Sequence, residues 1–498
     1  MSAANESNRR PIALCWIVAG TLLLSGGEIA RANWMFVRGD ANGDGVIQIN
    51  DPIVVLSFLF QGGPGFCLDA MDAADSGLVD IGDAIYILSY LFSAGTSPLE
   101  PFPACGQDPT ADAIGCAGPV ASCPPGPCRF APPVAYGAGN FTLSLALGDV
   151  DGDGDLDVLT ANSFPSNGVS MFLGDGDGTL APVVHYQVGG NPQSIKLGDI
   201  DADGDLDAVL ANSGFLSVNL LLGNNDGTFA ASGSYDAGAG SHYAALGDVD
   251  GDGDLDVVAA NSISADSGSV SVVSNFGDGT FAAPVQHAVE SNPQTVTLGD
   301  VNGDGDLDAL TANTGLFSVG DTPGSTVSIL LGNGDGTLAA QSILEVGLRP
   351  RSATLGDVDG DGDVDVLATN TGEFSYSPMP GETPGTTVSL LSGNGDGTFA
   401  TQVTQTVGNA PHSVALGDVD GDGSLDAVTA NYSSNSASFL FGNGDGTFAS
   451  HVQYAAGTTP IDVALGDLDG DGDLDALTTT FLIFLAPSTV TVLLNECF

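Results

Sequence analysis

Basic residues are scarce in this chain of 498 residues: 8 lysines and arginines stand against 62 aspartates and glutamates, for a formal net charge of −54. Such a polyanion has no electrostatic attraction for nucleic acid or for an anionic membrane surface, so both are excluded as partners. An acidic excess is also typical of disorder, but hydrophobic residues make up 43% of the chain. The acidic residues are instead concentrated in repeated phrases, where bound divalent cations are the expected counter-charge.

Sequence motifs of common catalytic sites are also absent. The chain contains no GxSxG nucleophile elbow, no HExxH helix and no phosphate-binding loop. Its carboxylate pairs would suit glycoside hydrolysis, but cation binding already accounts for them. We therefore expect a non-catalytic protein, with an extracellular hydrolase or lyase as the less favoured alternative. Five histidines are isolated in the sequence and are expected at the surface or between repeats: His185, His242, His287, His412 and His451.

Long apolar runs are missing as well, apart from one short run near the N-terminus. Arg9-Arg10 precede the apolar run Pro11 to Leu24, and Ala30-Arg31-Ala32 has the small-x-small pattern of a cleavage site. The run is shorter than the ~20 residues that a membrane span needs, which disfavours an anchor. The sequence therefore predicts a signal peptide over residues 1–32 and a secreted or cell-surface protein without membrane insertion.

One phrase recurs seven times between Leu147 and Asp475. Its first copy is LGDVDGDGDLD at residues 147–157, and successive copies lie 49 to 61 residues apart. A period of this length is typical of one β-sheet per repeat. The leading aspartates of the seven copies are Asp149, Asp199, Asp248, Asp300, Asp357, Asp418 and Asp467.

Each repeat predicts four strands. In the repeat that starts at Ser413 we expect strands at 414–416, 425–430, 437–441 and 448–454, with a tight glycine-rich turn before the last one. Seven such units over residues 128–498 predict an all-β, seven-bladed propeller of four-stranded antiparallel blades. A calcium-binding β-helix would show a nine-residue period throughout, and a string of sandwiches would need about twice the length per unit.

The two ends of the repeat region are expected to meet. Phe130 to Val134 matches Phe281 to Val285, which has the sequence of a fourth strand, whereas the C-terminus stops after a third strand at Thr489 to Leu494. The first strand should therefore complete the last blade and remove an open sheet edge. Cys128 and Cys497 fall at the two ends of this seam, and we predict a disulfide between them. The pairing of Cys67, Cys105, Cys116 and Cys123 stays open.

The aspartate phrase also has the ligand pattern of a calcium loop. Asp149, Asp151, Asp153 and Asp157 occupy positions 1, 3, 5 and 9, and Asp155 at position 7 can offer its backbone carbonyl. Asp-Gly runs are turn formers too, but seven copies with ligand positions held as Asp or Asn favour cations. We expect about seven Ca²⁺ ions here and hairpin turns, not metal sites, at the Gly-Asp-Gly-Thr segments.

The other six copies supply equivalent ligands at positions 3, 5, 7 and 9, after the leading aspartates named above. They are Asp201, Asp203, Asp205 and Asp207; Asp250, Asp252, Asp254 and Asp256; Asn302, Asp304, Asp306 and Asp308; Asp359, Asp361, Asp363 and Asp365; Asp420, Asp422, Ser424 and Asp426; and Asp469, Asp471, Asp473 and Asp475.

These units resemble FG-GAP/VCBS repeats, and their loops resemble those of the integrin α-subunit propeller. The resemblance covers about 370 residues and is carried by the aspartate phrase. It implies a secreted or surface propeller with its calcium loops on one face and ligands often bound on the opposite face. The expected function is a binding or adhesion module for an extracellular protein or glycan, with a lectin-like protein as the alternative.

A second calcium-binding unit is predicted at residues 33–96, followed by a Pro/Gly/Cys-rich linker at 97–127. It contains two loop-helix segments with Gly45 and Gly77 at the sharp turn of each loop. The pair resembles a type I dockerin, although Ala74 and Ser76 replace ligands in the second loop. The resemblance implies a cohesin-like partner and one or two Ca²⁺ ions; the alternative is a purely structural helix pair. The expected ligands are Asp40, Asn42, Asp44, Val46 and Asp51 in the first loop and Asp72, Asp80 and Asp83 in the second.

A candidate ligand face is expected opposite the calcium loops of the propeller. Two long, similar loops at 315–326 and 372–387 would carry aromatic side chains there, close in sequence to two arginines. Aromatic residues and arginine are typical anchors of interfaces and sugar sites. The alternative is that the loops are surface insertions and the arginines pair with nearby acids. The residues concerned are Phe317, Arg349, Arg351, Phe374 and Tyr376.

Overall fold

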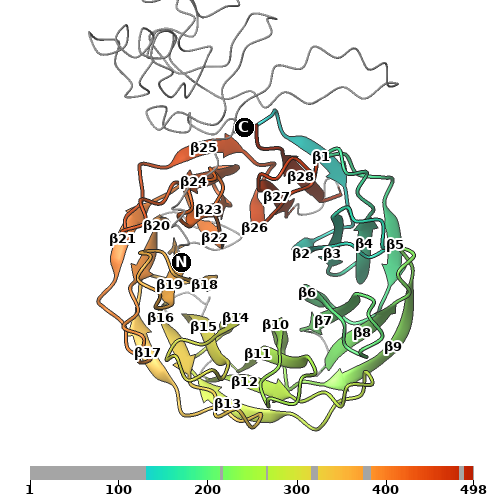
Figure 1. Ribbon diagram of the computed structural model, residues 1–498, viewed down its shortest axis with the longest axis horizontal. Helices are drawn as coiled ribbons and strands as arrows, with labels where there is room; N and C mark the ends of the chain where they lie inside the picture. The colour runs from blue at the N-terminus through green and yellow to red at the C-terminus, as the bar shows by residue number, and fades with distance from the viewer. Residues whose placement is uncertain are drawn as a thin grey trace, which may run out of the picture. The chain divides into compact units, whose positions relative to one another are not determined.

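The computed structural model of the chain contains a ring of seven four-stranded antiparallel sheets around a central axis (Figure 1). It describes residues 130–213, 217–264, 267–315, 323–373, 383–481 and 487–496, which belong to the unit Pro124–Phe498. The seven-bladed propeller is therefore confirmed. The signal peptide, the dockerin-like unit, the linker, Cys128, Cys497, Phe317, Phe374 and Tyr376 lie outside the described residues.

The first four blades follow one another along the chain, each with its first strand nearest the axis (Figure 1). They consist of β2 (Thr142–Gly148), β3 (Asp157–Asn162), β4 (Gly168–Phe172) and β5 (Val184–Gln187); β6 (Pro192–Gly198), β7 (Asp207–Asn212), β8 (Ser217–Gly223) and β9 (Phe229–Asp236); β10 (Ser241–Gly247), β11 (Asp256–Ser264), β12 (Ser267–Val273) and β13 (Val285–Val289); and β14 (Pro293–Gly299), β15 (Asp308–Gly315), β16 (Pro323–Leu330) and β17 (Ser342–Glu345).

The last three blades complete the circle. They consist of β18 (Ala353–Gly356), β19 (Asp365–Gly372), β20 (Pro384–Leu391) and β21 (Val403–Thr406); β22 (Pro411–Gly417), β23 (Asp426–Asn431), β24 (Ser436–Leu440) and β25 (Val452–Ala455); and β26 (Pro460–Gly466), β27 (Asp475–Thr480) and β28 (Thr489–Leu493) with β1 (Val134–Gly137). No helix with the length and hydropathy of a membrane span occurs in the described part of the chain.

Neighbouring blades bury each other's faces. Every residue of β3 and of β7 is buried, as expected for strands covered on both sides. Leu159 of the first blade packs in one cluster with Ile195 and Leu210 of the second, and all three side chains are fully buried. The hydrophobic core is thus divided among the contacts between blades. In the outermost strands, such as β5 and β25, the residues are exposed or half-buried. A single blade could not bury its own apolar surface.

The outermost strand begins later than the sequence predicts. In the sixth blade, Phe448 makes only an isolated bridge with Gly442, and regular pairing starts where Phe439 meets Val452 in β25. The intervening residues bring the chain from the tight turn to the rim. The predicted strand at 448–454 therefore divides into a turn-closing bridge and a short strand.

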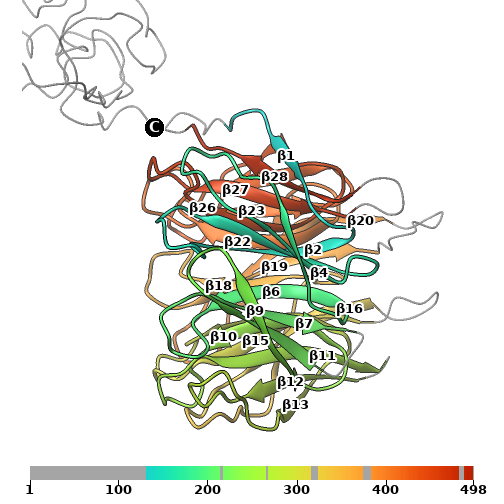
Figure 2. The ribbon, with the colours of Figure 1, turned by 90° about the vertical axis from the view of Figure 1, so that its right-hand side faces the viewer.

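The predicted closure of the ring is confirmed. β1 pairs antiparallel with β28, with Val134 opposite Val492, and Figures 1 and 2 show the two strands side by side. Phe130 extends the contact through a bridge to Asn495, and its ring lies 4.1 Å from the ring of Phe439, between centroids. The N-terminal strand therefore joins the last blade to the apolar core of the sixth, and no blade is left with an unpaired third strand.

The seam generates a prediction for the two cysteines. In the sequence, Cys128 stands two residues before Phe130, and Cys497 stands two residues after Asn495, the bridge partner of Phe130. A disulfide there closes a very long loop and should stabilise the protein by up to about 5 kcal/mol in the chain-entropy model. We expect a linked Cys128–Cys497 peptide in a non-reducing digest, and a lower melting temperature for Cys128→Ser.

The double variant Cys128→Ser/Cys497→Ser is the control. It should melt at the same temperature as each single variant, since one bond is lost in all three. Additive losses would show that the two cysteines do not form a bond with each other.

Candidate functional site

Each aspartate phrase forms a closed loop between the first and second strands of its blade. In the first copy the carboxylate of Asp149 accepts hydrogen bonds from the backbone N–H groups of Gly152 at 2.7 Å and Gly154 at 3.0 Å. Both glycines have positive φ, 77° and 98°, a conformation that L side chains rarely adopt. The alternating glycines therefore let the chain wrap around the leading carboxylate, and the acidic side chains gather on the inside of the loop.

The gathered carboxylates form clusters that can bind a metal ion. In the first blade, oxygens of Asp149, Asp151 and Asp157 lie within 4.8 Å of one another. An all-oxygen set of three carboxylates with nearby carbonyls suits a hard cation such as Ca²⁺. Similar clusters are formed by Asp199, Asp201 and Asp203; Asp248, Asp250 and Asp256; Asp357, Asp359 and Asp361; and Asp418, Asp420 and Asp426. In the two remaining loops, the leading carboxylates of Asp300 and Asp467 each accept hydrogen bonds from the two equivalent glycine N–H groups.

The ninth-position aspartate has a structural role that the ligand pattern did not predict. Asp157 is fully buried, and its two oxygens accept hydrogen bonds from the backbone N–H groups of Val150 and Gly174, both at 2.8 Å. Val150 lies in the aspartate loop, and Gly174 begins the turn before the fourth strand. The same pair of bonds occurs in every blade, at Asp207, Asp256, Asp308, Asp365, Asp426 and Asp475.

Burial raises the pKa of these ninth-position carboxyls, while the two backbone N–H donors act in the opposite direction. The pKa is about 6 for Asp157, Asp207 and Asp256, and about 7 for Asp426 and Asp475. Neighbouring carboxylates of the loop add to the rise. A bound cation would oppose it, because it favours the ionised form.

The seventh-position side chain contacts the second turn of its own blade. The carboxylate of Asp155 lies so close to Gly176 that a Cβ on this glycine would be 2.5 Å from an oxygen. In the sixth blade Ser424 takes the place of the aspartate. Its hydroxyl oxygen lies 3.1 Å from the position that a Cβ on Gly444 would occupy. The shorter side chain fits the turn equally well.

The Gly-Asp-Gly-Thr segments form hairpin turns, as predicted. Thr179 donates its hydroxyl and its N–H to Asp177 at 2.6 and 3.1 Å, and Gly174 bridges to Leu180. The aspartates of these turns therefore accept hydrogen bonds from the threonine that follows.

In six of the seven blades, residues at or near the position of this turn donate a hydrogen bond to the aspartate loop of the blade before. The N–H of Gly227 in the second blade donates to the carbonyl of Val150 in the first at 3.1 Å. Equivalent bonds join Gly178 to Leu468, Gly336 to Val249 and Gly397 to Val301, all at 3.1 Å. The side-chain amide of Asn275 donates to the backbone carbonyl of Ile200 at 2.7 Å, and that of Asn495 donates to the carbonyl of Val419 at 2.8 Å. The aspartate loop is thus a joint between blades as well as a candidate metal site.

A second candidate site lies at the mouth of the central channel, at the opposite end of the first strands. One side chain from each blade contributes to its wall, five residues before the glycine that precedes the aspartate loop. In most blades this residue lies at a β-bulge, which re-aims a side chain out of the regular ladder. The seven residues are Leu143, Gln193, His242, Gln294, Arg351, His412 and Ile461.

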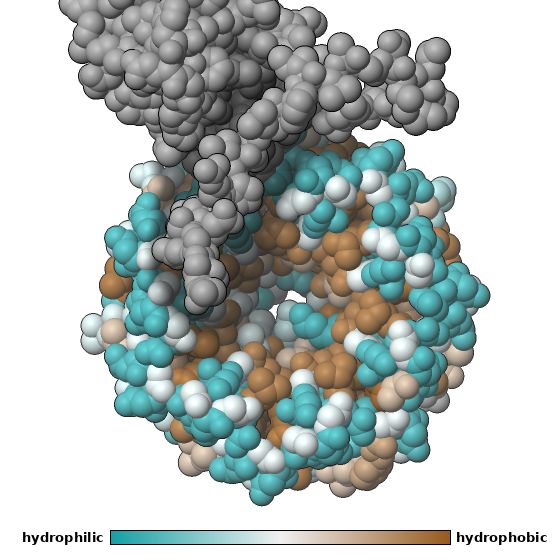
Figure 3. All heavy atoms as spheres, in the orientation of Figure 1, coloured by the Kyte–Doolittle hydropathy of each residue, from teal (hydrophilic) through white to brown (hydrophobic). Residues whose placement is uncertain are grey.

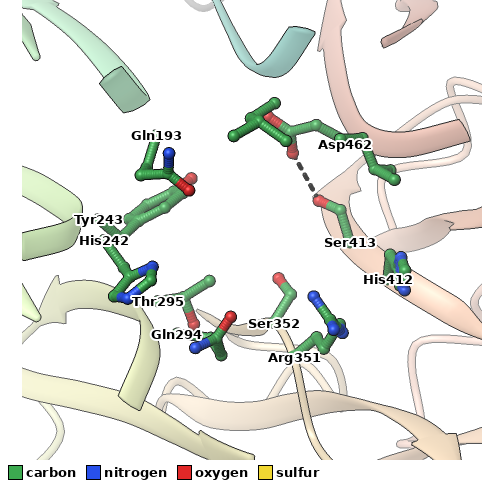
Figure 4. A pocket seen from close by; sticks show the side chains of 12 residues that line it. Gln193, His242, Tyr243, Gln294, Thr295, Arg351, Ser352, His412, Ser413 and Asp462 are labelled. Atoms are coloured by element: carbon green, nitrogen blue, oxygen red, sulfur yellow. Dashed lines mark hydrogen bonds between the residues drawn. The ribbon is translucent and has the colours of Figure 1, made fainter. Parts of the chain in front are cut away.

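This mouth is a cavity of about 110 Å³ that continues into a channel of about 490 Å³ along the axis. Figure 4 shows Asp462 and Ser413 across an open space from Gln193 and Tyr243, with Arg351 on a third side. The opening at the centre of the ring is also visible in Figure 3, bordered by apolar side chains. Polar groups of several blades therefore face one cavity that is open to solvent.

The candidate ligand face is only partly described. Arg351 lines the channel mouth. Arg349 lies in the connection between β17 and β18, where its backbone N–H donates to the carbonyl of Gly324 at 2.7 Å. His242 and His412 are isolated in the sequence, and the ring brings both to the channel mouth. Burial, followed by the nearby Arg351 charge, lowers the pKa of both imidazoles.

Sequence reasoning missed most of the channel mouth. Lys196, Tyr243 and Asp462 belong to three different blades, and no local motif links them. The sequence does contain one signal. When the first strands of the seven blades are aligned, these three residues stand at positions where most other blades have alanine, serine or threonine.

A ring of seven four-stranded antiparallel blades with an acidic loop in each defines a seven-bladed β-propeller. The sequence matches the FG-GAP-like repeat family over residues 149–210, 199–259, 248–311, 316–368, 381–429 and 418–478, more than half of the chain. The chain belongs to this family. Four of the matched segments begin at the leading aspartate of a phrase.

Solved structures share the architecture at low identity. A lectin of Agrocybe aegerita, solved for its specific recognition of non-reducing terminal N-acetylglucosamine, is 20% identical over 67% of this chain and 81% of the lectin, with a TM-score of 0.40. BBS1N in complex with ARL6DN is 12% identical over 74% of this chain and 97% of that one, with a TM-score of 0.50. The comparison with curated proteins finds no match. The structural likeness extends to the fold alone.

Removing a ninth-position carboxylate should destabilise the protein even without metal. In Asp157→Ala, two buried N–H groups lose their acceptors, at about 1–3 kcal/mol each, so we expect the free energy of unfolding to fall by about 2–6 kcal/mol. Urea denaturation with a chelator present measures this loss free of any metal effect. The matched control is Asp155→Ser, which copies Ser424 and should change stability by less than about 0.5 kcal/mol. Equal losses in both variants would contradict the bracing role of Asp157.

The raised pKa values predict how the stability of the metal-free protein depends on pH. The folded state holds protons on these aspartates more tightly than the unfolded chain does, so stability should fall as the pH rises from about 4 to about 7. Added Ca²⁺ should restore stability most at the upper end of this range. Thermal melting of chelated protein across the range checks the trend, and a melting temperature that rises with pH would contradict it.

Proposed function

We propose that this protein is an exported, calcium-stabilised β-propeller that serves as a non-catalytic binding module. The observation that carries the proposal is the double use of each aspartate loop. The loop gathers carboxylates into a cation-sized cluster, and its backbone also accepts the hydrogen bond that joins the next blade. A cation that fixes the loop would therefore fix the whole ring and any surface built across several blades.

Electrostatics support a calcium requirement. Carboxylates about 4 Å apart repel by about 4 kcal/mol per pair at an effective dielectric constant near 20, and the loops hold many such pairs. Neutralising them with Ca²⁺ removes this repulsion. The all-oxygen clusters favour Ca²⁺ over Mg²⁺, because Mg²⁺ gives up its water reluctantly.

The signal-like N-terminus supports export to a compartment where Ca²⁺ is plentiful. The dockerin-like segment supports tethering of the propeller through a cohesin-like partner. The proposed ligand is an extracellular protein or glycan that binds away from the calcium loops.

A lectin-like role is the second candidate. It is favoured by the channel mouth, where amide, hydroxyl and imidazole side chains of several blades surround one cavity. Groups of this kind suit the hydroxyls of a sugar, and an adhesion surface for protein would be flatter and richer in apolar anchors.

Chelation tests the proposed function. The full chain should melt at a markedly lower temperature in chelator than in Ca²⁺, with recovery on adding Ca²⁺ and weaker recovery with Mg²⁺. Capture of ligands from extracellular material should be lost in chelator as well. An unchanged melting temperature in a protein shown to be metal-free would refute the calcium requirement. Hydrolysis of a polymer by the purified protein would refute the non-catalytic role.

A further inference from the structure

Three polar side chains of the axial channel depart from the pattern of the repeat. Lys196 lies two residues before the glycine that ends the first strand of its blade, where the other six blades have alanine or threonine. Tyr243 and Asp462 lie four residues before the equivalent glycine, where the other five blades have serine or threonine. All seven blades form the same four-stranded sheet and all three residues line the channel, so blade packing does not account for them.

Tyr243 holds Lys196 against the channel wall. The Nζ of the lysine lies 3.1 Å from the phenolic oxygen and 4.8 Å from the centroid of the ring. Burial lowers the pKa of Lys196, but Tyr243 and then Asp462 outweigh burial, so the pKa lies above its usual value. An ammonium group has three N–H donors, and in the described part of the chain the phenol uses one of them. Two donors therefore remain for a molecule in the channel.

Asp462 faces the same channel from the seventh blade. Its Oδ1 accepts hydrogen bonds from the hydroxyl of Ser413 at 2.8 Å and from the backbone N–H of Val463 at 3.1 Å. Its Oδ2 accepts one from the backbone N–H of Leu145 at 3.0 Å. Burial raises the pKa of this carboxyl, whereas the charge of Lys196 and these hydrogen bonds act in the opposite direction. A carboxylate has about four acceptor positions, so Oδ2 can accept one more hydrogen bond.

Hydroxyl groups of other blades line the channel as well. Thr295 of the fourth blade and Ser352 of the fifth face the same open space as Asp462 (Figure 4). The Oγ1 atom of Thr295 is buried, and the described residues provide no hydrogen-bond partner for it. A buried hydroxyl without a partner costs free energy, and a polar ligand would remove that cost.

The far end of the channel is apolar. Leucines that directly precede the glycines of the first strands line it, among them Leu197, Leu246 and Leu298. The wall is therefore amphipathic, with polar groups towards the mouth and aliphatic groups beyond them. The channel volume of about 490 Å³ lies within the range of about 300–1,000 Å³ that is typical of small-molecule sites.

We propose that the axial channel binds an uncharged saccharide, with Lys196 donating to its oxygens and Asp462 accepting from one of its hydroxyls. A sugar hydroxyl can both donate and accept, and the C–H groups of the ring can pack on the leucines. The described lining of the channel contains one lysine and one aspartate and no other ionised group. A ligand with a net charge would therefore meet a like charge beside an opposite one. This assignment rests on the proposed binding function and names its ligand class.

Calorimetric titration of the calcium-loaded full chain tests the assignment. Glucose, galactose, mannose and N-acetylglucosamine are the probes. Glucuronate is the charged analogue, and glycine is a zwitterion that could also pair with the lysine and the aspartate. We expect at least one neutral sugar to bind more tightly than glucuronate and glycine. Lys196→Met should weaken binding of that sugar by about tenfold or more, because it removes charge-assisted hydrogen bonds.

Asp462→Asn changes a different blade and should weaken binding of the same sugar, so the assignment stays testable if either variant fails to fold. Glu345→Gln is the matched control, because it removes a charge from the exposed outermost strand of the fourth blade. It should leave the affinity within about twofold of the original.

Binding of none of the four sugars, tighter binding of glucuronate or glycine, or equal losses in Lys196→Met and Glu345→Gln would overturn the assignment. Capture of an extracellular ligand that Lys196→Met leaves unchanged would place the binding function elsewhere on the propeller. The melting temperature of the same preparation with and without Ca²⁺ separates the two proposals. A calcium-dependent melting temperature in protein that binds no sugar would refute the channel site and leave the calcium requirement intact.

Discussion

The repulsion among the aspartates of each loop is the constraint on which the propeller depends. The fold brings three carboxylates within 4.8 Å of one another in several blades and buries the ninth-position carboxyl completely. Backbone N–H groups compensate part of this cost, as at Asp157, but they leave the burial-raised pKa of about 6. A divalent cation is the natural remaining compensation, because it neutralises several carboxylates at once.

The aspartate loop lies at the contact between two blades, so a cation bound there would affect the whole ring. Its carbonyl at Val150 accepts the N–H of Gly227 from the next blade, and equivalent bonds occur at six of the seven joints between blades. The core is likewise shared between blades, and β1 closes the ring against β28. A cation bound in one loop would therefore support two blades. Every blade contributes a side chain to the channel mouth.

The architecture could be predicted from the sequence because the same strand and turn pattern occurs seven times. The period of the aspartate phrase, the alternating strands and the fourth-strand sequence at Phe130 each point to a closed propeller, and the pairing of Phe130 with Asn495 confirms it. The bracing role of Asp157 could not be predicted, because its second donor, Gly174, is 17 residues away and acts through its backbone. The positions of Lys196, Tyr243 and Asp462 in the channel could not be predicted for a related reason. Each is a single departure from the repeat, and only closure of the ring brings them together.

Hydrogen exchange at the joints between blades distinguishes a ring held by cations from a ring held by packing alone. Chelation should speed exchange of the Gly227, Gly336 and Gly397 amides, which donate to the preceding aspartate loop, well before it affects amides inside β3 and β7. Ca²⁺ should restore their protection. If these amides exchanged at the same rate in metal-free and calcium-loaded protein, the aspartate loops would not be cation-dependent joints, and the account would be wrong.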